Sequence, residues 1–181
     1  LEFRRVLFRS DADEVIRGMM TSEKWDQSKY YGLSQDEIKR LWREKGEMAA
    51  AEGTKMHEAI EDHFNGCPGA MDRLGECERR QFAAFLDRLP EALEPYRTEW
   101  AIWDDELRLA GTVDMVFKNE NGELLIYDWK RTPKIERSNS WGKTATAEGL
   151  EHLPDSNFWK YGLQLNVYKT MLERTYGAKV A

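Results

Sequence analysis

A short polar segment between two β-prone stretches is the feature that most constrains this fold. Residues 107–117 and 124–130 are rich in aliphatic, β-branched and aromatic side chains, and the segment Lys118-Asn119-Glu120-Asn121-Gly122-Glu123 separates them. An Asn-Gly pair between two such stretches is typical of a hairpin turn. We therefore expect the two stretches to pair as antiparallel strands.

The length of the hairpin loop decides which side chains lie opposite one another. A two-residue turn would place Asp114 opposite Trp129, whereas a three-residue loop would place it opposite Asp128, with Cβ atoms about 5 Å apart. Two carboxylates at that distance repel each other and need a cation. We predict the three-residue loop, with Gly122 in the left-handed conformation. Its register has three further pairs: Asn119 with Glu123, Val116 with Ile126, and Phe117 with Leu125.

The segment Tyr127-Asp128-Trp129-Lys130 carries a carboxylate and an amine two residues apart. Alternate residues of a strand face the same side, so Asp128 and Lys130 are expected to project together while Trp129 points away. Such a carboxylate can bind a hard divalent cation, and the lysine can position the water that attacks a phosphate. A structural ion pair at a strand end is the alternative that these residues leave open.

Four further residues could complete such a site. His57 lies on a predicted helix with Glu61 one turn further on; it could bind a divalent metal, or be an ordinary surface or capping histidine. Glu99 could add a carboxylate, or be a solvated strand residue. Gln164 and Tyr168 lie one turn apart on the last helix and could hold a nucleotide or a water network, although Tyr168 could equally pack in the core.

The rest of the chain predicts an α/β fold in which a mixed central sheet is flanked by helices. Residues 1–10 resemble a translated vector scar and are left out of the fold prediction. A helical region is expected over 11–92, contributing His57 to the site, and the core over 93–181. The predicted helices are 11–20, Ser34 to about Phe64 with a break or kink near Gly53, 75–89 and 156–176. The predicted strands are 97–104, 107–117 and 124–130, and a polar loop over 131–154 follows them. A further strand is expected to start after the last helix.

Composition excludes several classes of protein. No stretch approaches the roughly 18 apolar residues of a membrane-spanning helix, and no secretory signal is visible. Cys67 and Cys77 are too few for a disulfide framework or a four-thiolate metal site, which favours an intracellular, reducing setting and no secretion. The net charge of -6 argues against coating nucleic acid by bulk charge, but not against a nucleic-acid enzyme.

The polar loop after the third strand concentrates positive charge. Lys130 directly precedes this loop, and the basic residues of the loop are Arg131, Lys134, Arg137 and Lys143. Two tryptophans, Trp141 and Trp159, could stack on unpaired bases. The loop could therefore follow a nucleic-acid strand, or simply be solvated.

Five short motifs occur in an order that is similar to one enzyme family: GTKMH (53–57), TEW (98–100), GTVD (111–114), YDWK (127–130) and QLNVY (164–168). Over residues 11–181 the chain resembles the PD-(D/E)XK nuclease superfamily and its RecB-like exonuclease branch, including mitochondrial genome maintenance exonucleases and their phage and large-virus relatives. The second acid of the common E-x-K pattern is Asp128 here, which still provides a carboxylate. The iron–sulfur subset of this branch needs four cysteines, so no iron–sulfur cluster is expected.

The resemblance implies a restriction-endonuclease-like core and a metal-dependent DNA exonuclease, acting on single-stranded ends in replication, recombination or repair. It implies that Asp114 and Asp128 bind Mg²⁺ or Mn²⁺, with the Trp129 carbonyl in the coordination shell, and that Lys130 positions the attacking water. His57 would be a further ligand. Other residues expected at the metal or along the DNA path are Glu99, Gln164, Tyr168, Arg131, Lys134, Trp141 and Lys143. An endonuclease or nickase with the same site and a catalytically silent nucleic-acid-binding module remain alternatives. Compared with the family core, the chain is expected to be a fragment truncated at both ends.

Overall fold

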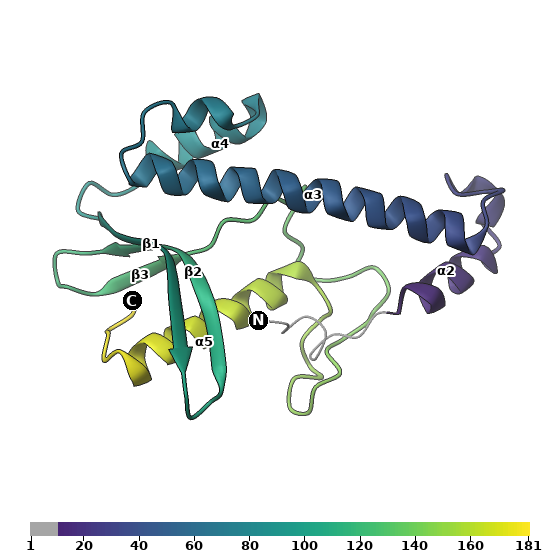
Figure 1. Ribbon diagram of the computed structural model, residues 1–181. Coiled ribbons are helices and arrows are strands. Elements are labelled where there is room, and N and C mark those ends of the chain that lie inside the picture. The colour runs from purple at the N-terminus through teal and green to yellow at the C-terminus, as the bar shows by residue number, and fades with distance from the viewer. Residues whose placement is uncertain (1–10) are drawn as a thin grey trace. The chain divides into compact units, whose positions relative to one another are not determined.

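The computed structural model describes residues 11–181, so the predicted vector scar lies outside the described residues (Figure 1). The described chain divides into two compact units. One contains residues 53–137 and 156–181, and the other contains residues 11–52 and 138–155. The boundary predicted at residue 92 stays a prediction. Among the described residues, no helix combines the length and apolar character needed to span a membrane.

The first two helices begin at the polar caps that their sequences predict. Helix α2 (Ala12–Met20) starts after Asp11, whose side chain accepts a hydrogen bond from the Asp13 N–H. A short 3-10 turn, η1 (Trp25–Gln27), follows. Ser34 and Glu37 form a capping box: the Ser34 N–H donates to the Glu37 carboxylate over 2.8 Å, and the Glu37 N–H donates to the Ser34 hydroxyl over 3.3 Å.

Helix α3 (Gln35–Phe64) runs for 30 residues without interruption. The predicted break near Gly53 is therefore wrong. A glycine inside a helix costs only about 1 kcal/mol relative to alanine, and residues that favour helix flank it on both sides. The consequence is that His57 is held on a continuous helix rather than after a hinge.

A small aromatic core joins α3 to the next helices. A 3-10 turn, η2 (Ala70–Arg73), precedes helix α4 (Glu76–Leu86), which lies within the predicted range 75–89. Four residues of this core are buried: Ala59, Ile60, Leu74 and Phe82. The rings of Phe64 and Phe85 also contact Phe117 of the sheet, with centroids 5.4 Å and 6.5 Å away. These contacts attach α3 and α4 to one side of the sheet.

The sheet has three antiparallel strands in the order β1 (Glu94–Asp104), β2 (Leu109–Lys118) and β3 (Leu124–Tyr127). The predicted register of β2 and β3 is confirmed, because Val116 pairs with Ile126 and Phe117 with Leu125. The three-residue loop is confirmed as well. The Asn119 N–H donates to the Glu123 carbonyl over 3.0 Å, and Gly122 has φ 78°.

Strand β3 ends at Tyr127, so its predicted extension to Lys130 is wrong. The backbone beyond Tyr127 makes other bonds. The Trp129 N–H donates to the Asp114 carboxylate, and the Trp129 carbonyl lies 3.0 Å from the His57 ring. Side chains of the candidate site therefore take the place of a partner strand.

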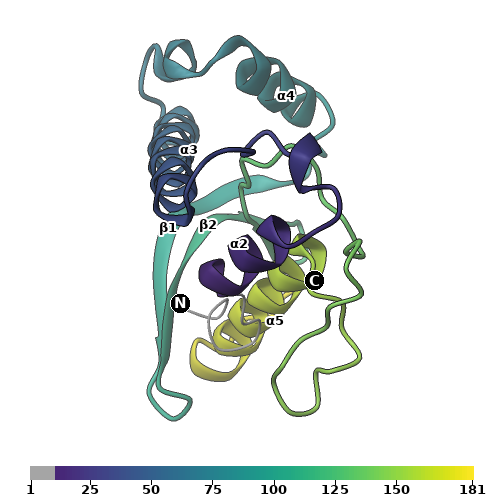
Figure 2. The same ribbon diagram turned by 90° about the vertical axis from the view of Figure 1, so that its right-hand side faces the viewer.

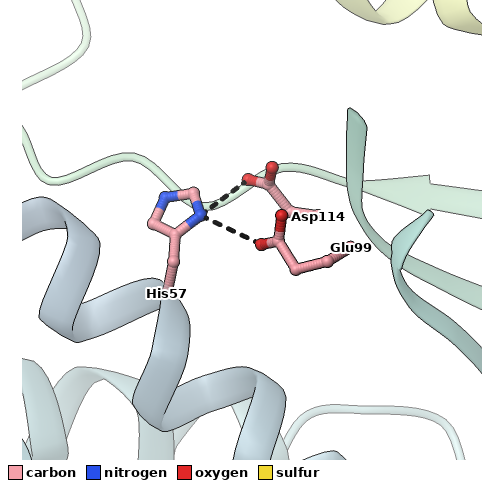
Figure 3. Close-up of side chains that lie close together, drawn as sticks. All are labelled: His57, Glu99 and Asp114. Carbon is pink, nitrogen blue, oxygen red and sulfur yellow. Dashed lines mark ion pairs between the residues drawn. The ribbon is translucent and has the colours of Figure 1, made fainter. Parts of the chain in front are cut away.

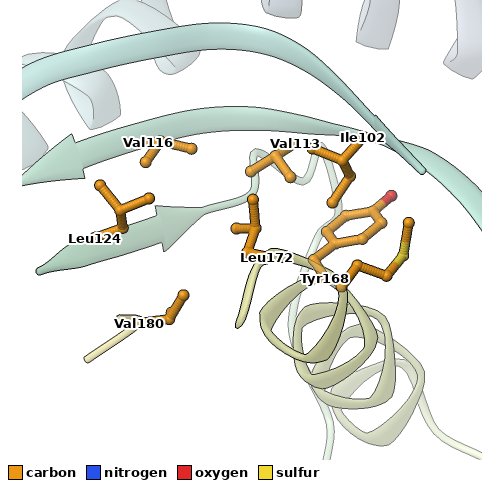
Figure 4. Packing of buried hydrophobic residues seen from close by; sticks show 8 residues of the cluster. Ile102, Val113, Val116, Leu124, Tyr168, Leu172 and Val180 are labelled. Atoms are coloured by element: carbon orange, nitrogen blue, oxygen red, sulfur yellow. The ribbon is translucent and has the colours of Figure 1, made fainter. Parts of the chain in front are cut away.

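Helix α5 (Asn157–Thr175) covers the sheet face that holds the larger apolar core (Figures 1, 2 and 4). The buried members of this core are Ile102, Val113, Val116, Leu124, Tyr168, Met171, Leu172 and Val180. After Gly177, Val180 lies parallel to Leu124 in an isolated bridge. This bridge lies where the further strand is predicted to start. It adds a parallel pairing to the antiparallel strands of the described chain, as a mixed sheet requires. The predicted α/β class is confirmed.

Candidate metal centre

Three elements bring a histidine and two carboxylates together. His57 comes from α3, Glu99 from β1 and Asp114 from β2, and one ligand atom from each lies within 4.8 Å of the others (Figure 3). The Nδ1 atom of His57 is 3.5 Å from Oε1 of Glu99 and 3.6 Å from Oδ2 of Asp114. We call these three residues the metal cluster.

The orientation of the His57 ring suits a cation ligand. Its Nε2 lies 3.0 Å from the Trp129 carbonyl oxygen, and this bond requires a proton on Nε2. In the neutral ring, the lone pair of Nδ1 then points toward two carboxylates, and either a proton on Nδ1 or a bound cation makes that arrangement favourable. Metal-binding histidines commonly donate their second N–H to a carbonyl in this way. One imidazole nitrogen and two carboxylate oxygens therefore form a donor set that fits a divalent cation.

Glu99 reaches the cluster from an unusual backbone conformation. Its neighbours Thr98 and Trp100 pair with Met115 and Val113, which places Glu99 opposite Asp114. Its φ of 43° lies in the left-handed region, which costs a residue with a Cβ atom about 1–2 kcal/mol. Strained backbone of this kind often accompanies function.

Asp114 is the acid of the cluster that is most deeply buried, with 9% of its side chain exposed. Burial, followed by the negative charge of Asp128, raises the pKa of Asp114 to about 6. The positive charge of His57 and the Trp129 N–H oppose this shift in pKa. The site therefore disfavours two negative charges together unless a cation accompanies them.

Asp128 lies outside the metal cluster and bonds to other groups. Its Oδ2 contacts the Lys130 amine, and its side chain is 4% exposed. The predicted proximity of Asp128 and Lys130 is thus present, although it arises beyond the end of β3. Gln164 Nε2 donates to Asp128 Oδ1 over 3.4 Å and to the Tyr168 hydroxyl over 2.9 Å. Tyr168 is also 3% exposed and belongs to the core, so it packs in the core and bonds to Gln164 at once.

A cavity of about 370 Å³ opens beside His57 and Glu99. Its wall also includes Thr54, Glu58 and Glu61 of α3. Burial, and then the charge of Glu99, raises the pKa of Glu61. Thr54 and Glu58 are not among the predicted site residues, although Thr54 lies one helical turn before His57 and Glu58 lies beside it.

The predicted DNA-binding residues of the polar loop fall into both compact units. Arg131 and Lys134 belong to the unit that contains the metal cluster; Arg131 bonds to Glu78 over 3.0 Å, and Lys134 bonds to Glu136 over 2.6 Å. Trp141, which is 84% exposed, and Lys143 belong to the other unit. The role of these four residues along a DNA path stays a prediction.

Comparison with known families identifies the class of protein. The family model described as the PD-(D/E)XK nuclease superfamily matches residues 27–181. The chain belongs to this superfamily, which confirms the resemblance at that level, and the α/β architecture is consistent with its restriction-endonuclease-like fold. Membership implies a nuclease with a nucleic-acid substrate. No curated protein and no solved structure matches the chain.

Proposed function

We propose that the protein is a Mg²⁺- or Mn²⁺-dependent DNA exonuclease of the RecB-like branch, acting on single-stranded ends. One observation carries this proposal. A histidine and two carboxylates from three separate elements converge within 4.8 Å, and the Asp128–Lys130 pair follows directly after the neighbouring strand. The YDWK and GTVD motifs that indicated the family supply Asp114, Asp128 and Lys130.

Two groups of residues have separate roles in the proposed reaction. His57, Glu99 and Asp114 would hold the cation, and Asp128 would join them as a ligand on the side of Lys130. A divalent cation bound there lowers the pKa of water and stabilises negative charge on the phosphate. Lys130 has three N–H donors, and its bond to Asp128 leaves others that can hold the attacking water.

The residues around this pair keep it in place. Gln164 fixes Asp128 from α5, and the Trp129 carbonyl fixes the His57 ring. In the hydrolysis, the water oxygen forms a bond to phosphorus and the bridging P–O bond breaks. The water proton leaves to solvent, and the departing oxygen is protonated in turn. Positioning and electrostatic stabilisation are therefore the main contributions of these side chains.

The test uses DNA labelled at its 5′ or 3′ end, single- or double-stranded, linear or circular, with Mg²⁺, Mn²⁺ or a chelator. We expect wild-type protein to shorten linear single strands in a metal-dependent way. Lys130→Ala and Asp128→Ala should lose activity while remaining folded by circular dichroism. Lys24→Ala and Asp26→Ala, at exposed positions, are the matched controls.

The outcomes separate the remaining possibilities. Cleavage of circular single strands would replace exonuclease by endonuclease or nickase activity. Binding of DNA without hydrolysis under any metal condition would indicate a silent binding module. Wild-type rates in Lys130→Ala or Asp128→Ala would show that the proposed mechanism is wrong.

A further inference from the structure

A second, smaller cavity is lined by Trp129 and by residues of α3 and α4. Its volume is about 150 Å³. The rings of Phe82, Phe85 and Trp129 share its wall with three other apolar side chains, and Glu78, Gln81 and Lys130 add polar groups. Phe85 and Trp129 meet edge to face, with ring centroids 5.1 Å apart. We call this space the aromatic cavity.

The aromatic cavity shares two residues, Trp129 and Lys130, with the candidate active site. The backbone of Trp129 bonds to Asp114 and His57 of the metal cluster, whereas its ring lines the cavity. Lys130 lines the cavity too, and its amine contacts Asp128. A ligand in this cavity would thus lie against Lys130, which is proposed to position the attacking water, and against Trp129, the residue before it.

The size and lining of the cavity favour one flat ring system. Pockets for drug-sized ligands are commonly about 300–1,000 Å³, well above the volume here. Aromatic walls suit the faces and edges of another ring. Glu78 offers acceptor oxygens, and the Gln81 amide offers both a donor and an acceptor. Nucleobases combine a flat ring with donors and acceptors on its edge.

We propose that the aromatic cavity receives one unpaired base of the DNA strand whose phosphate lies at the metal cluster. This inference rests on the proposed function and deepens it. A base inside a duplex is stacked and paired, so it must leave the helix before it can enter such a cavity. The cavity would therefore favour single-stranded ends, and its base would fix the register of the strand.

The test removes single bases from the ligand and blocks the cavity in the protein. Fluorescent single-stranded oligonucleotides, each with one abasic site at a successive position, are titrated with the full chain in a chelator. We expect one position at which loss of the base weakens binding about 10-fold, since stacking of a base on aromatic side chains is commonly that strong.

A blocking variant tests whether this position corresponds to the cavity. Gln81 is exposed at the rim, and Gln81→Trp should fill the opening. We expect this variant to bind the intact strand about 10-fold more weakly and to lose the position-specific penalty. Ala83→Trp, on the exposed part of the same helix and outside the cavity, should keep the wild-type pattern.

Two results would overturn the inference without touching the proposed nuclease activity. One is an abasic series in which no position stands out for wild-type protein. The other is a penalty that persists in a folded Gln81→Trp variant, which would show that the sensitive base binds outside the cavity. Metal-dependent hydrolysis is measured in parallel, and its absence from wild-type protein would instead remove the proposed function.

Discussion

The backbone N–H of Trp129 donates to Oδ2 of Asp114 across 2.7 Å. The last pair between β2 and β3 joins Met115 to Tyr127, and this bond lies two residues beyond Tyr127. In place of a backbone hydrogen bond between strands, a side-chain bond links the GTVD and YDWK motifs, which carry the proposed catalytic acids. The carbonyl oxygen of Trp129 lies 3.0 Å from Nε2 of His57. Five testable predictions follow from this arrangement and from the structure around it.

Removal of the His57 imidazole should weaken cation binding. Its Nδ1 lies within 3.6 Å of both carboxylates of the metal cluster, so His57→Ala removes a ligand and the fixed orientation together. We expect Mn²⁺ affinity to fall at least about 10-fold, since the loss of even an outer partner commonly has that effect. Calorimetric titration measures this change. His152→Ala, at an exposed histidine, is the control, and equal affinity in the two variants would contradict the assignment.

The metal-free protein should lose stability as Asp114 ionises. Because the pKa of Asp114 is raised from 3.8 to about 6, its protonated form is favoured in the folded state. Its contribution to stability is complete below pH 3.8 and is lost as the pH rises through about 6. Relative to Asp114→Asn, the free energy of unfolding of wild-type protein should fall by up to about 3 kcal/mol across this range.

Urea denaturation in a chelator, at several pH values, measures this difference. Asp105→Asn, at an exposed position, is the control and should show no such trend. A stability difference between wild type and Asp114→Asn that does not change with pH would contradict the prediction.

Asp104 should have the opposite pH dependence. The Leu107 N–H at 2.8 Å, followed by the Thr175 hydroxyl, lowers the pKa of Asp104, and Arg174 adds a favourable charge. A carboxylate with a lowered pKa stabilises the folded state above its unfolded pKa of 3.8, and this effect is lost as the pH falls through the lower folded value. Asp104→Asn should therefore lower the melting temperature at neutral pH and have a smaller effect in strong acid. An unchanged melting temperature at neutral pH would rule out this stabilising role.

Two glycine-to-alanine substitutions should have opposite effects on stability. Gly122 has φ 78°, and an added Cβ would meet the Lys118 side chain at an ordinary 3.8 Å, so the cost of Gly122→Ala is conformational. We expect it to lower the free energy of unfolding by about 1 kcal/mol. Gly46 lies inside α3 with open space around it, so Gly46→Ala should raise the free energy of unfolding by up to about 1 kcal/mol. Denaturant unfolding measures the change in the free energy of unfolding for both variants. A change of the same sign in both would contradict the turn geometry.

DNA binding should weaken as salt rises if the basic loop neutralises phosphates. For single strands, each phosphate contact contributes about 0.7 to the slope of log affinity against log salt concentration. Lys134→Ala and Lys143→Ala should each reduce that slope by about this amount, as measured by fluorescence anisotropy. Lys24→Ala, at an exposed position outside the loop, should not. If neither loop variant changes the slope, Lys134 and Lys143 do not contact phosphates and the loop is simply solvated.

The hairpin could be predicted from sequence because its information is local. Gly122 permits the left-handed turn of a three-residue loop, and the length of that loop sets the register of β2 and β3. The start of α3 has a local signal as well, because Ser34 and Glu37 form a capping box there. The break predicted near Gly53 is absent because one glycine does not end a helix whose other residues favour it on both sides.

The details of the candidate site depend on long-range contacts that sequence patterns do not contain. Strand β3 was predicted too long because its end is set by bonds to Asp114 and His57, which lie far away in the chain. Glu99 could be named as a candidate carboxylate. Its positive φ opposite Asp114 could not be predicted, since such a conformation is uncommon for glutamate.

At position 99, the residue that is best for stability differs from the residue that is best for the proposed metal site. Glycine or asparagine would adopt a φ of 43° more easily than glutamate does, but neither brings a carboxylate to the cluster. A library screened for heat resistance alone should therefore discard the acid at position 99. The same library screened for DNA cleavage should retain it, so comparing the two outcomes would reveal how much stability this protein gives up for its chemistry.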